Sequence, residues 1–304
     1  MKRFLFVSLL VSLLIPVTAT QAAGEAGNDV AHNLVEKVLD RYIGNTEVSR
    51  MSLVTCAYRD KGESIGCSSA PRRKTVQSIS KMYGEKLKDS RGLMLILEPV
   101  AEYGIGILQY DYVESGADSD QWMYLPELDQ VKRIASSNDA PKKGSLFGSE
   151  FSLEDMERQK LSEYTYKILG KETVNGTELV KVEHIPTPAR AKKSNYSKRI
   201  QWIDETRLLV VKEEYYELSG ELFKVKMSSD LVESDNIWTA KKVMMRNLKT
   251  RRVSMLLYAD VTYNLPIQDD ALTPRILSDA VFRENFIKSL RQEKPAAAMP
   301  VARQ

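Results

Sequence analysis

Residues 253–263 have the sequence VSMLLYADVTY, in which apolar side chains recur at every second position. One phase of this stretch is formed by Val253, Met255, Leu257, Ala259, Val261 and Tyr263. A period of two residues is typical of an antiparallel strand with one buried face, because successive side chains point to opposite sides of a sheet. The stretch therefore predicts a protein built mainly from antiparallel strands.

The same pattern extends over much of the chain. Phe223, Val225 and Met227 alternate with lysines. Turn-forming dipeptides separate the candidate strands, at Lys61-Gly62, Asn175-Gly176 and Ser219-Gly220. We expect roughly ten to twelve strands in one large, meandering sheet.

Residues 93–97 are apolar in both phases, so both faces of this strand must be covered. In the next segment, 103–108, Gly104 and Gly106 share one face. A glycine within a strand leaves space for close approach by a helix, a bulge or a ligand. Two interpretations stay open: a helix packed across a curved sheet, or an apolar cavity that holds a ligand.

Three segments predict helices or loops. Val30, Leu34 and Val38 recur every four residues, which predicts an opening helix over residues 30–42. Residues 138–150 predict a long loop, and the N-cap signal at 152–155 predicts a short helix to about Lys160. Thr273-Pro274 predicts the start of a terminal helix that ends near Leu290.

The N-terminus has the layout of a secretory signal peptide. Lys2 and Arg3 precede an apolar run over residues 4–17, which is shorter than the roughly 20 residues of a membrane-spanning helix. We expect cleavage after Ala22, with no cysteine at the junction for a lipid anchor. The predicted organisation is a signal peptide over 1–22, a single domain over 23–290 and a flexible tail over 291–304, exported to the periplasm.

Composition and charge exclude several classes of protein. The chain has 44 basic and 41 acidic residues, a formal charge of +3, and the signal peptide removes two of the basic ones. This balance, without basic stretches that contain stacking aromatics, argues against nucleic-acid binding. Two cysteines are too few for a zinc ribbon.

Cys56 and Cys67 form the one cysteine pair of the sequence, and export would place it in an oxidising compartment. They are equidistant from the Lys61-Gly62 turn signal, so in a two-residue hairpin they would face each other. We expect a structural disulfide, with reduced or intermolecular forms as the alternative.

The sequence contains no catalytic constellation that we can identify. His32 and His184 lack metal-ligand spacing, and no GxSxG, Walker A or strand-linked GxGxxG motif is present. We therefore expect no enzyme activity, no cofactor and no metal. Glu150, Glu154 and Asp155 form an acidic cluster for which helix capping is the simpler explanation and cation binding the alternative.

A basic cluster without acids lies between Thr187 and Ile200, and it consists of Arg190, Lys192, Lys193, Lys198 and Arg199. A solvated loop is the simpler interpretation. The alternative is contact with anionic lipid head groups or an acidic partner, because surface cations are attracted to anionic membranes.

Three blocks of sequence are characteristic of a known family: WMYLP at 122–126, VKRI at 131–134 and GSEFSLEDM at 148–156. With later blocks at Tyr215-Tyr216 and 261–267, the chain resembles the LolA-like outer-membrane lipoprotein-sorting protein family from about residue 30 to 280. The resemblance implies a mainly β fold, an incomplete antiparallel barrel of about eleven strands closed by helices, with an apolar cavity for acyl chains. The sequence departs from the family pattern in Glu150, where relatives usually have Asp, and in the cysteine pair.

The resemblance implies a periplasmic carrier that shuttles lipid or lipoprotein acyl chains between membranes. Such members often accompany inner-membrane exporters of the resistance-nodulation-division (RND) type, so an accessory subunit without cargo is the alternative. We expect a monomer with only transient membrane contact. The candidate cavity residues are Met94, Ile96, Ile105, Ile107, Trp122, Tyr124, Phe223, Val225, Met227, Met255 and Leu257, provided that each strand presents these residues to the interior.

Overall fold

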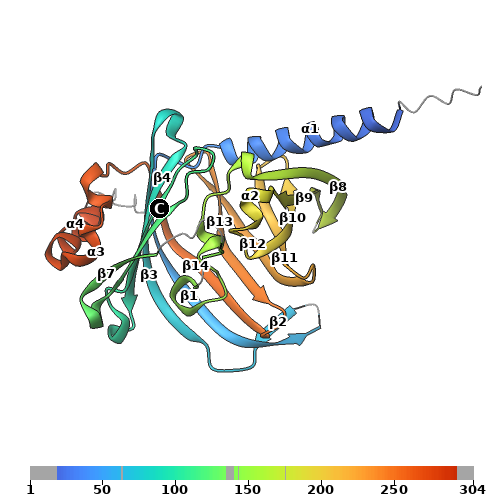
Figure 1. Ribbon diagram of the computed structural model, residues 1–304. Helices are drawn as coiled ribbons and strands as arrows, with labels where there is room; N and C mark the ends of the chain where they lie inside the picture. Colours follow the sequence, from blue (N-terminus) through green and yellow to red (C-terminus); the bar gives the residue numbers. More distant parts are fainter. Residues whose placement is uncertain (1–18, 63, 135–139, 143, 175, 293–304) are drawn as a thin grey trace, which may run out of the picture.

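One antiparallel sheet dominates the computed structural model, which describes residues 19–62, 64–134, 140–142, 144–174 and 176–292 (Figure 1). Within these residues the sheet has 14 strands in the order β7-β6-β5-β4-β3-β1-β14-β13-β12-β11-β10-β9-β8, with β2 paired to β1. The strands are β1 Thr46–Lys61, β2 Ser64–Cys67, β3 Arg72–Tyr83, β4 Asp89–Glu98, β5 Gly106–Asp111, β6 Asp120–Leu125, β7 Gln130–Ile134, β8 Tyr164–Val174, β9 Thr177–Pro186, β10 Tyr196–Asp204, β11 Leu209–Glu217, β12 Leu222–Ser234, β13 Ile237–Asn247 and β14 Arg252–Tyr263.

The sheet is curved and open, because β7 and β8 are its edges and do not pair with each other. The predicted incomplete antiparallel barrel is therefore confirmed, with more strands than expected. β1 lies near the middle of the order, where it pairs with β3 and with β14.

Helices cover parts of both faces. The helices are α1 Ala19–Asp40, α2 Pro188–Ala191, α3 Arg275–Ser278 and α4 Ala280–Gln292. Short 3-10 turns are η1 Glu85–Leu87, η2 Val100–Glu102, η3 Pro126–Leu128, η4 Leu146–Gly148, η5 Glu154–Met156, η6 Leu161–Glu163 and η7 Asp269–Leu272. α1 packs on the β8 end of the sheet, whereas α3 and α4 pack on the outer, convex face beside β4 to β7 (Figure 1). Among the described residues, no helix combines the length and apolarity needed to cross a membrane.

The predicted opening and terminal helices are confirmed with corrected limits, whereas the short helix predicted after residue 152 is not present. The opening helix ends at Asp40 and includes residues before Val30. The terminal helix is split at Asp279, because the Asp279 carboxylate accepts a bond from the Phe282 amide at 2.9 Å and caps α4. The predicted helix after residue 152 is only the turn η5, although Ser152 and Asp155 do bond to each other's amides. Residues 1–18 and 293–304, which hold most of the predicted signal peptide and tail, lie outside the described residues.

Both faces of β4 are buried, as predicted. Leu93 and Leu95 pack on the convex face in a cluster with α3 and α4, whereas Met94 and Ile96 pack on the concave face. Gly106 on the neighbouring strand permits this helix packing. A Cβ atom there would lie 2.9 Å from Leu277 Cδ2 of α3 and 2.6 Å from Leu95 Cδ2. Gly106 therefore allows a helix to pack closely on the convex face. The concave face is also apolar, and it is the face on which a ligand cavity could lie.

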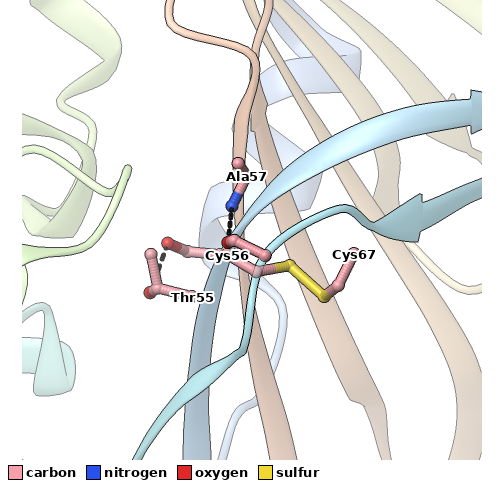
Figure 2. The surroundings of a disulfide bond; sticks show 6 residues. Thr55, Cys56, Ala57 and Cys67 are labelled. Carbon is pink, nitrogen blue, oxygen red and sulfur yellow. Dashed lines mark hydrogen bonds between the residues drawn. A yellow bond between two sulfur atoms is a disulfide. The ribbon is translucent and has the colours of Figure 1, made fainter.

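The predicted disulfide between Cys56 and Cys67 is present, with 5.7 Å between the Cα atoms (Figure 2). Its predicted register is wrong. Lys61 pairs with Ser64, and Cys67 lies opposite Tyr58 rather than Cys56. Gly62 adopts a φ of +61°, which suits it to the first position inside the turn and shifts the turn centre by one residue. The disulfide therefore joins the two strands diagonally.

Candidate functional site

A cavity of about 620 Å³ lies on the concave face of the sheet. Its lining comes from β1, β3 to β5 and β11 to β14, from the end of α1, and from the segment of residues 144–160, which we call the plug. Most of the lining is apolar, with side chains that include Leu39, Met94, Ile107, Leu153, Val243 and Leu256. This volume falls within the roughly 300–1,000 Å³ that is typical of small-molecule sites.

The plug fills the part of the concave face next to this cavity. Leu146, Phe147, Phe151 and Leu153 are buried in one cluster with side chains of β1, β3 and β4. Glu150 fastens the plug to the sheet, because its carboxylate accepts bonds from Arg252 Nε at 2.7 Å and from Asn247 Nδ2 at 2.9 Å. The loop predicted over 138–150 is thus partly an interior element.

Asp155 ties the other end of the plug to β10 and β12. Its carboxylate accepts bonds from the Tyr196 hydroxyl at 2.7 Å and from Lys224 Nζ at 3.0 Å. Lys224 also donates to the Tyr196 oxygen at 2.9 Å. All three groups are buried or nearly so, which makes this a polar network inside the concave face.

Glu154 points to a different set of partners. Arg190 Nη2 donates to Glu154 Oε1 at 2.9 Å, and Arg199 Nη2 donates to the same oxygen at 3.2 Å. Burial raises the pKa of Glu154, but Arg199 and Arg190 outweigh it and hold the pKa below its ordinary value. Glu150, Glu154 and Asp155 therefore each have structural partners, and the described residues hold no group of three or more His, Cys, Asp or Glu arranged for a metal.

The predicted basic surface is largely neutralised within the protein. Arg190 also pairs with Glu157 and Glu163, Lys193 pairs with Asp118 at 2.8 Å, and Lys198 pairs with Glu183 at 2.9 Å. Arg199 is buried among Glu154 and three tyrosine rings. Lys192 is exposed. The solvated-loop interpretation is wrong for most of this cluster, because the carboxylates that match it come from distant segments.

The two histidines lie on the side of the sheet covered by α1. His32 is an exposed residue of α1 whose ring meets the edge of Tyr166. His184 is fully buried against Tyr166, and its Nδ1 lies 3.1 Å from Gln159 Nε2. Burial lowers the pKa of His184 to about 3, so this ring is neutral across the physiological range.

The structure brings only some of the predicted cavity residues together. Met94 and Ile107 line the cavity. Ile96, Ile105 and Phe223 pack in the cluster beneath the plug. The strands β4 and β5 thus present the expected face, and Phe223 reaches the interior at an irregularity in the pairing of β11 with β12.

The remaining predicted residues face away from the cavity. Trp122 and Tyr124 pack in the convex cluster with α3 and α4, and Met255 packs beside the disulfide. Leu257 shares the phase of Met255, and Val225 and Met227 lie on the opposite side of β12 from Lys224 and Lys226. The assumed phase is wrong for these strands, because apolar side chains also pack on the convex face. On β6 they meet α3 and α4, and on β14 Met255 packs in the cluster around Cys56.

Lysines occupy the interior phase of β12. Lys226 Nζ lies 2.5 Å from Glu213 Oε2, and both lie on the concave side. Burial raises the pKa of Glu213, but Lys226 and Arg199 bring it down to about 2. Lys226 thus pairs with Glu213 of the neighbouring strand β11, and Lys224 pairs with Asp155 of the plug, so charged residues occupy positions where the pattern predicts apolar ones.

Besides Lys226, four charged residues of the cavity were not predicted: Arg41, Glu47, Asp111 and Arg158. Burial raises the pKa of Glu47, and it raises the pKa of Asp111 to about 6. Their only sequence signal is a charge inside or next to an apolar segment, as with Arg41 directly after the apolar face of α1.

A family model described as that of an uncharacterized protein matches residues 88–279, more than half of the chain. The chain belongs to this family, DUF1329. A DUF1329 family protein from Desulfovibrio piger has the same fold, with a TM-score of 0.72 and 22% identity over 83% of this chain and 99% of that one. A search of curated proteins gives no match.

Two further structures relate this DUF1329 chain to lipoprotein-sorting folds. A domain from Vibrio parahaemolyticus, described as an outer membrane lipoprotein-sorting protein domain, has a TM-score of 0.70 and 25% identity over 84% of this chain and 99% of that one. A LolA superfamily protein from Nitrosomonas europaea has a TM-score of 0.57 and 20% identity over 80% of this chain and 97% of that one. The resemblance to the LolA-like family is confirmed.

Proposed function

We propose that this protein is a periplasmic carrier that holds lipid or lipoprotein acyl chains in the concave cavity and moves them between membranes. The cavity carries the proposal, because an apolar space of about 620 Å³ has room for a ligand. Exposure of each CH₂ group to water costs about 0.8 kcal/mol, so an acyl chain needs a cover to cross an aqueous compartment. The related lipoprotein-sorting fold from Vibrio parahaemolyticus adds support.

The periplasmic location belongs to the same proposal. The signal-peptide pattern at the N-terminus and the Cys56–Cys67 disulfide both favour an exported protein, since disulfides persist in oxidising compartments. An accessory subunit that docks on an RND-type exporter without cargo stays the alternative. It requires no interior space, so the cavity favours the carrier.

Gly92 offers a direct test of the cavity. It lines the cavity on β4, and no heavy atom lies within 4 Å of a Cβ built there. The variant Gly92→Phe places a ring in the space proposed for the acyl chain, whereas Gly92→Ala adds only a methyl group. We expect Gly92→Phe to weaken binding of a fluorescent acyl probe by about tenfold or more, and Gly92→Ala to bind like the wild type.

The unfolding free energy of both variants serves as the control for folding. If the folded Gly92→Phe protein binds the probe as tightly as the wild type, the cavity is not the binding site. If the wild type binds no acyl probe at all, the accessory-subunit alternative gains.

A further inference from the structure

Two arginines from distant segments line the same cavity near the C-terminal end of α1. Arg41 directly follows α1, and Arg158 lies in the plug just after η5. Both line the cavity, and each is partly buried. Burial and the charge of Arg158 lower the pKa of the Arg41 guanidinium, while Glu47 acts in the opposite sense. Asp111, Asp40 and Asp89 attract Arg158, but from beyond ion-pair distance.

The protein supplies these guanidinium groups with few acceptors. Arg41 Nη1 donates to the Trp238 carbonyl at 3.4 Å. Arg158 Nη2 donates to the Leu39 carbonyl at 3.3 Å, and its Nη1 contacts Met82 Sδ at 3.4 Å. Each guanidinium has five N–H donors, so most of them have no acceptor among the described residues. None of the described carboxylates lies within ion-pair distance of either group.

Three acids lie on the cavity wall. Asp155 pairs with Lys224, and neither Glu47 nor Asp111 lies within ion-pair distance of the two arginines. Glu47 accepts a bond from the Ser49 hydroxyl at 3.1 Å, and Asp111 accepts one from Gln109 Nε2 at 2.8 Å. Burial raises the pKa of both carboxyls, which weakens them as counterions. By contrast, the interior lysines Lys224 and Lys226 each have a carboxylate within 3.0 Å.

A purely structural role explains only part of Arg158. Its bond to the Leu39 carbonyl caps the C-terminal end of α1, where cations are favoured. That bond occupies one of the five N–H groups of Arg158, at 3.3 Å. It does not explain why a second cation, Arg41, lies in the same cavity. Buried charges are normally paired, because an isolated charge in an apolar environment costs several kcal/mol.

We propose that Arg41 and Arg158 form a binding site for the oxyanion head of an acyl-chain ligand, a carboxylate or a phosphate monoester, whose chain occupies the apolar remainder of the cavity. This rests on the proposed carrier function and adds the chemical class of the cargo. Guanidinium groups suit this task because their planar N–H donors match the geometry of carboxylate and phosphate oxygens.

Matched ligands that differ only in the head group test the site. Delipidated full-length protein is titrated near neutral pH with hexadecanoate and its methyl ester, and with monoacyl phosphatidic acid and monoacylglycerol, each in competition with an uncharged fluorescent probe. We expect the wild type to bind at least one anionic ligand about tenfold or more tightly than its uncharged partner. The pair that shows the preference identifies carboxylate or phosphate as the head group.

The variant that combines Arg41→Gln with Arg158→Gln should lose this preference while it keeps the wild-type affinity for the uncharged ligands. Arg50→Gln on the convex side, where Arg50 is exposed near α4, is the matched control and should keep the preference. Should the double variant fail to fold, Arg41→Gln alone carries the test, since it leaves the Arg158 bond to α1 intact.

The outcomes separate the two proposals. Equal wild-type affinity for charged and uncharged ligands overturns the head-group site and leaves the carrier proposal standing, and so does a preference that survives in the arginine variants. Binding of none of the four ligands overturns the carrier proposal and the head-group site with it.

Discussion

The Lys224 ammonium lies 3.0 Å from the Asp155 carboxylate, and this pair joins the plug to the concave side of β12. Both side chains are at most 6% exposed. The plug therefore closes over the interior with a charged contact at one end and with Phe151 and Leu153 packed on the apolar cluster.

Removal of one partner of this pair should be costly. In Asp155→Ala, the Lys224 charge stays buried without its carboxylate, and we expect the free energy of unfolding to fall by about 3–5 kcal/mol. Urea unfolding measures the change. The combination of Asp155→Ala with Lys224→Met should recover part of the loss, because it removes the isolated charge.

An exposed pair serves as the control. Lys171 and Glu178 lie 2.6 Å apart on β8 and β9 but are both more than half exposed, so Glu178→Ala should change stability little. If Glu178→Ala lowers the free energy of unfolding as much as Asp155→Ala does, then burial of the ion pair does not determine how much its removal destabilises the protein.

Gly106 should tolerate no side chain. In Gly106→Ala the added methyl group meets Leu277 of α3 and Leu95, and we expect a loss of about 1–3 kcal/mol in unfolding free energy. Gly92→Ala, on the neighbouring strand, adds its methyl group to open space and should cost clearly less. Equal losses in both variants would contradict the close approach of α3.

The disulfide should stabilise the fold without affecting the cavity. Cys56 and Cys67 are 11 residues apart, and closure of a loop of that size contributes about 2–3 kcal/mol in the chain-entropy model. The double replacement of both cysteines by alanine should therefore lower the unfolding free energy by about that amount. Because the bond lies with Met255 outside the cavity lining, acyl-probe affinity should not change, and a large loss of affinity would refute this placement.

His184 should make stability depend on pH. Burial lowers its pKa from 6.5 to about 3, so below about pH 6.5 the unfolded chain takes up a proton that the folded one does not. Stability is then lost as pH falls from about 6.5 to 3, by up to 1.36 kcal/mol per pH unit. The difference in unfolding free energy between the wild type and His184→Phe isolates this contribution.

We expect that difference to shift steadily between pH 6.5 and 4.5 in favour of His184→Phe. Asp111 acts in the opposite sense, because its raised pKa of about 6 removes stability as pH rises from 3.8 through 6, but it is common to both proteins and cancels. A constant difference over this range would mean that His184 titrates in the folded state as it does in the unfolded chain.

The sequence predicts the class of fold well because local patterns determine it. Alternation at 253–263 indicates the strands, and residues 93–97 indicate a strand buried on both faces. The cysteine pair and the Ser152–Asp155 cap are also local features, and the structure contains both.

The face that each strand turns inward is not a local property. On β12 Lys224 points inward because Asp155, which is 69 residues away in sequence, neutralises it, and Lys226 points inward because Glu213 lies opposite it on β11. On β6, Trp122 points outward because α3 and α4 return to that face from the end of the chain. Alternation gives the period of a strand, whereas partners elsewhere in the chain decide its phase.

The arginines of the cavity were missed for the same reason. Arg158 reaches the carbonyl of Leu39 across 119 residues of sequence, and no local motif predicts such a contact. Only folding places Arg158 in the lining of the same cavity as Arg41.

Native mass spectrometry of the protein, purified gently from the periplasm of the cell that produces it, tests the carrier function most directly. We expect a population heavier than the polypeptide by the mass of a bound lipid, which disappears in Gly92→Phe and persists in Gly92→Ala. A spectrum that contains only the mass of the bare polypeptide, under conditions that preserve a known lipid carrier with its ligand, would contradict the carrier function.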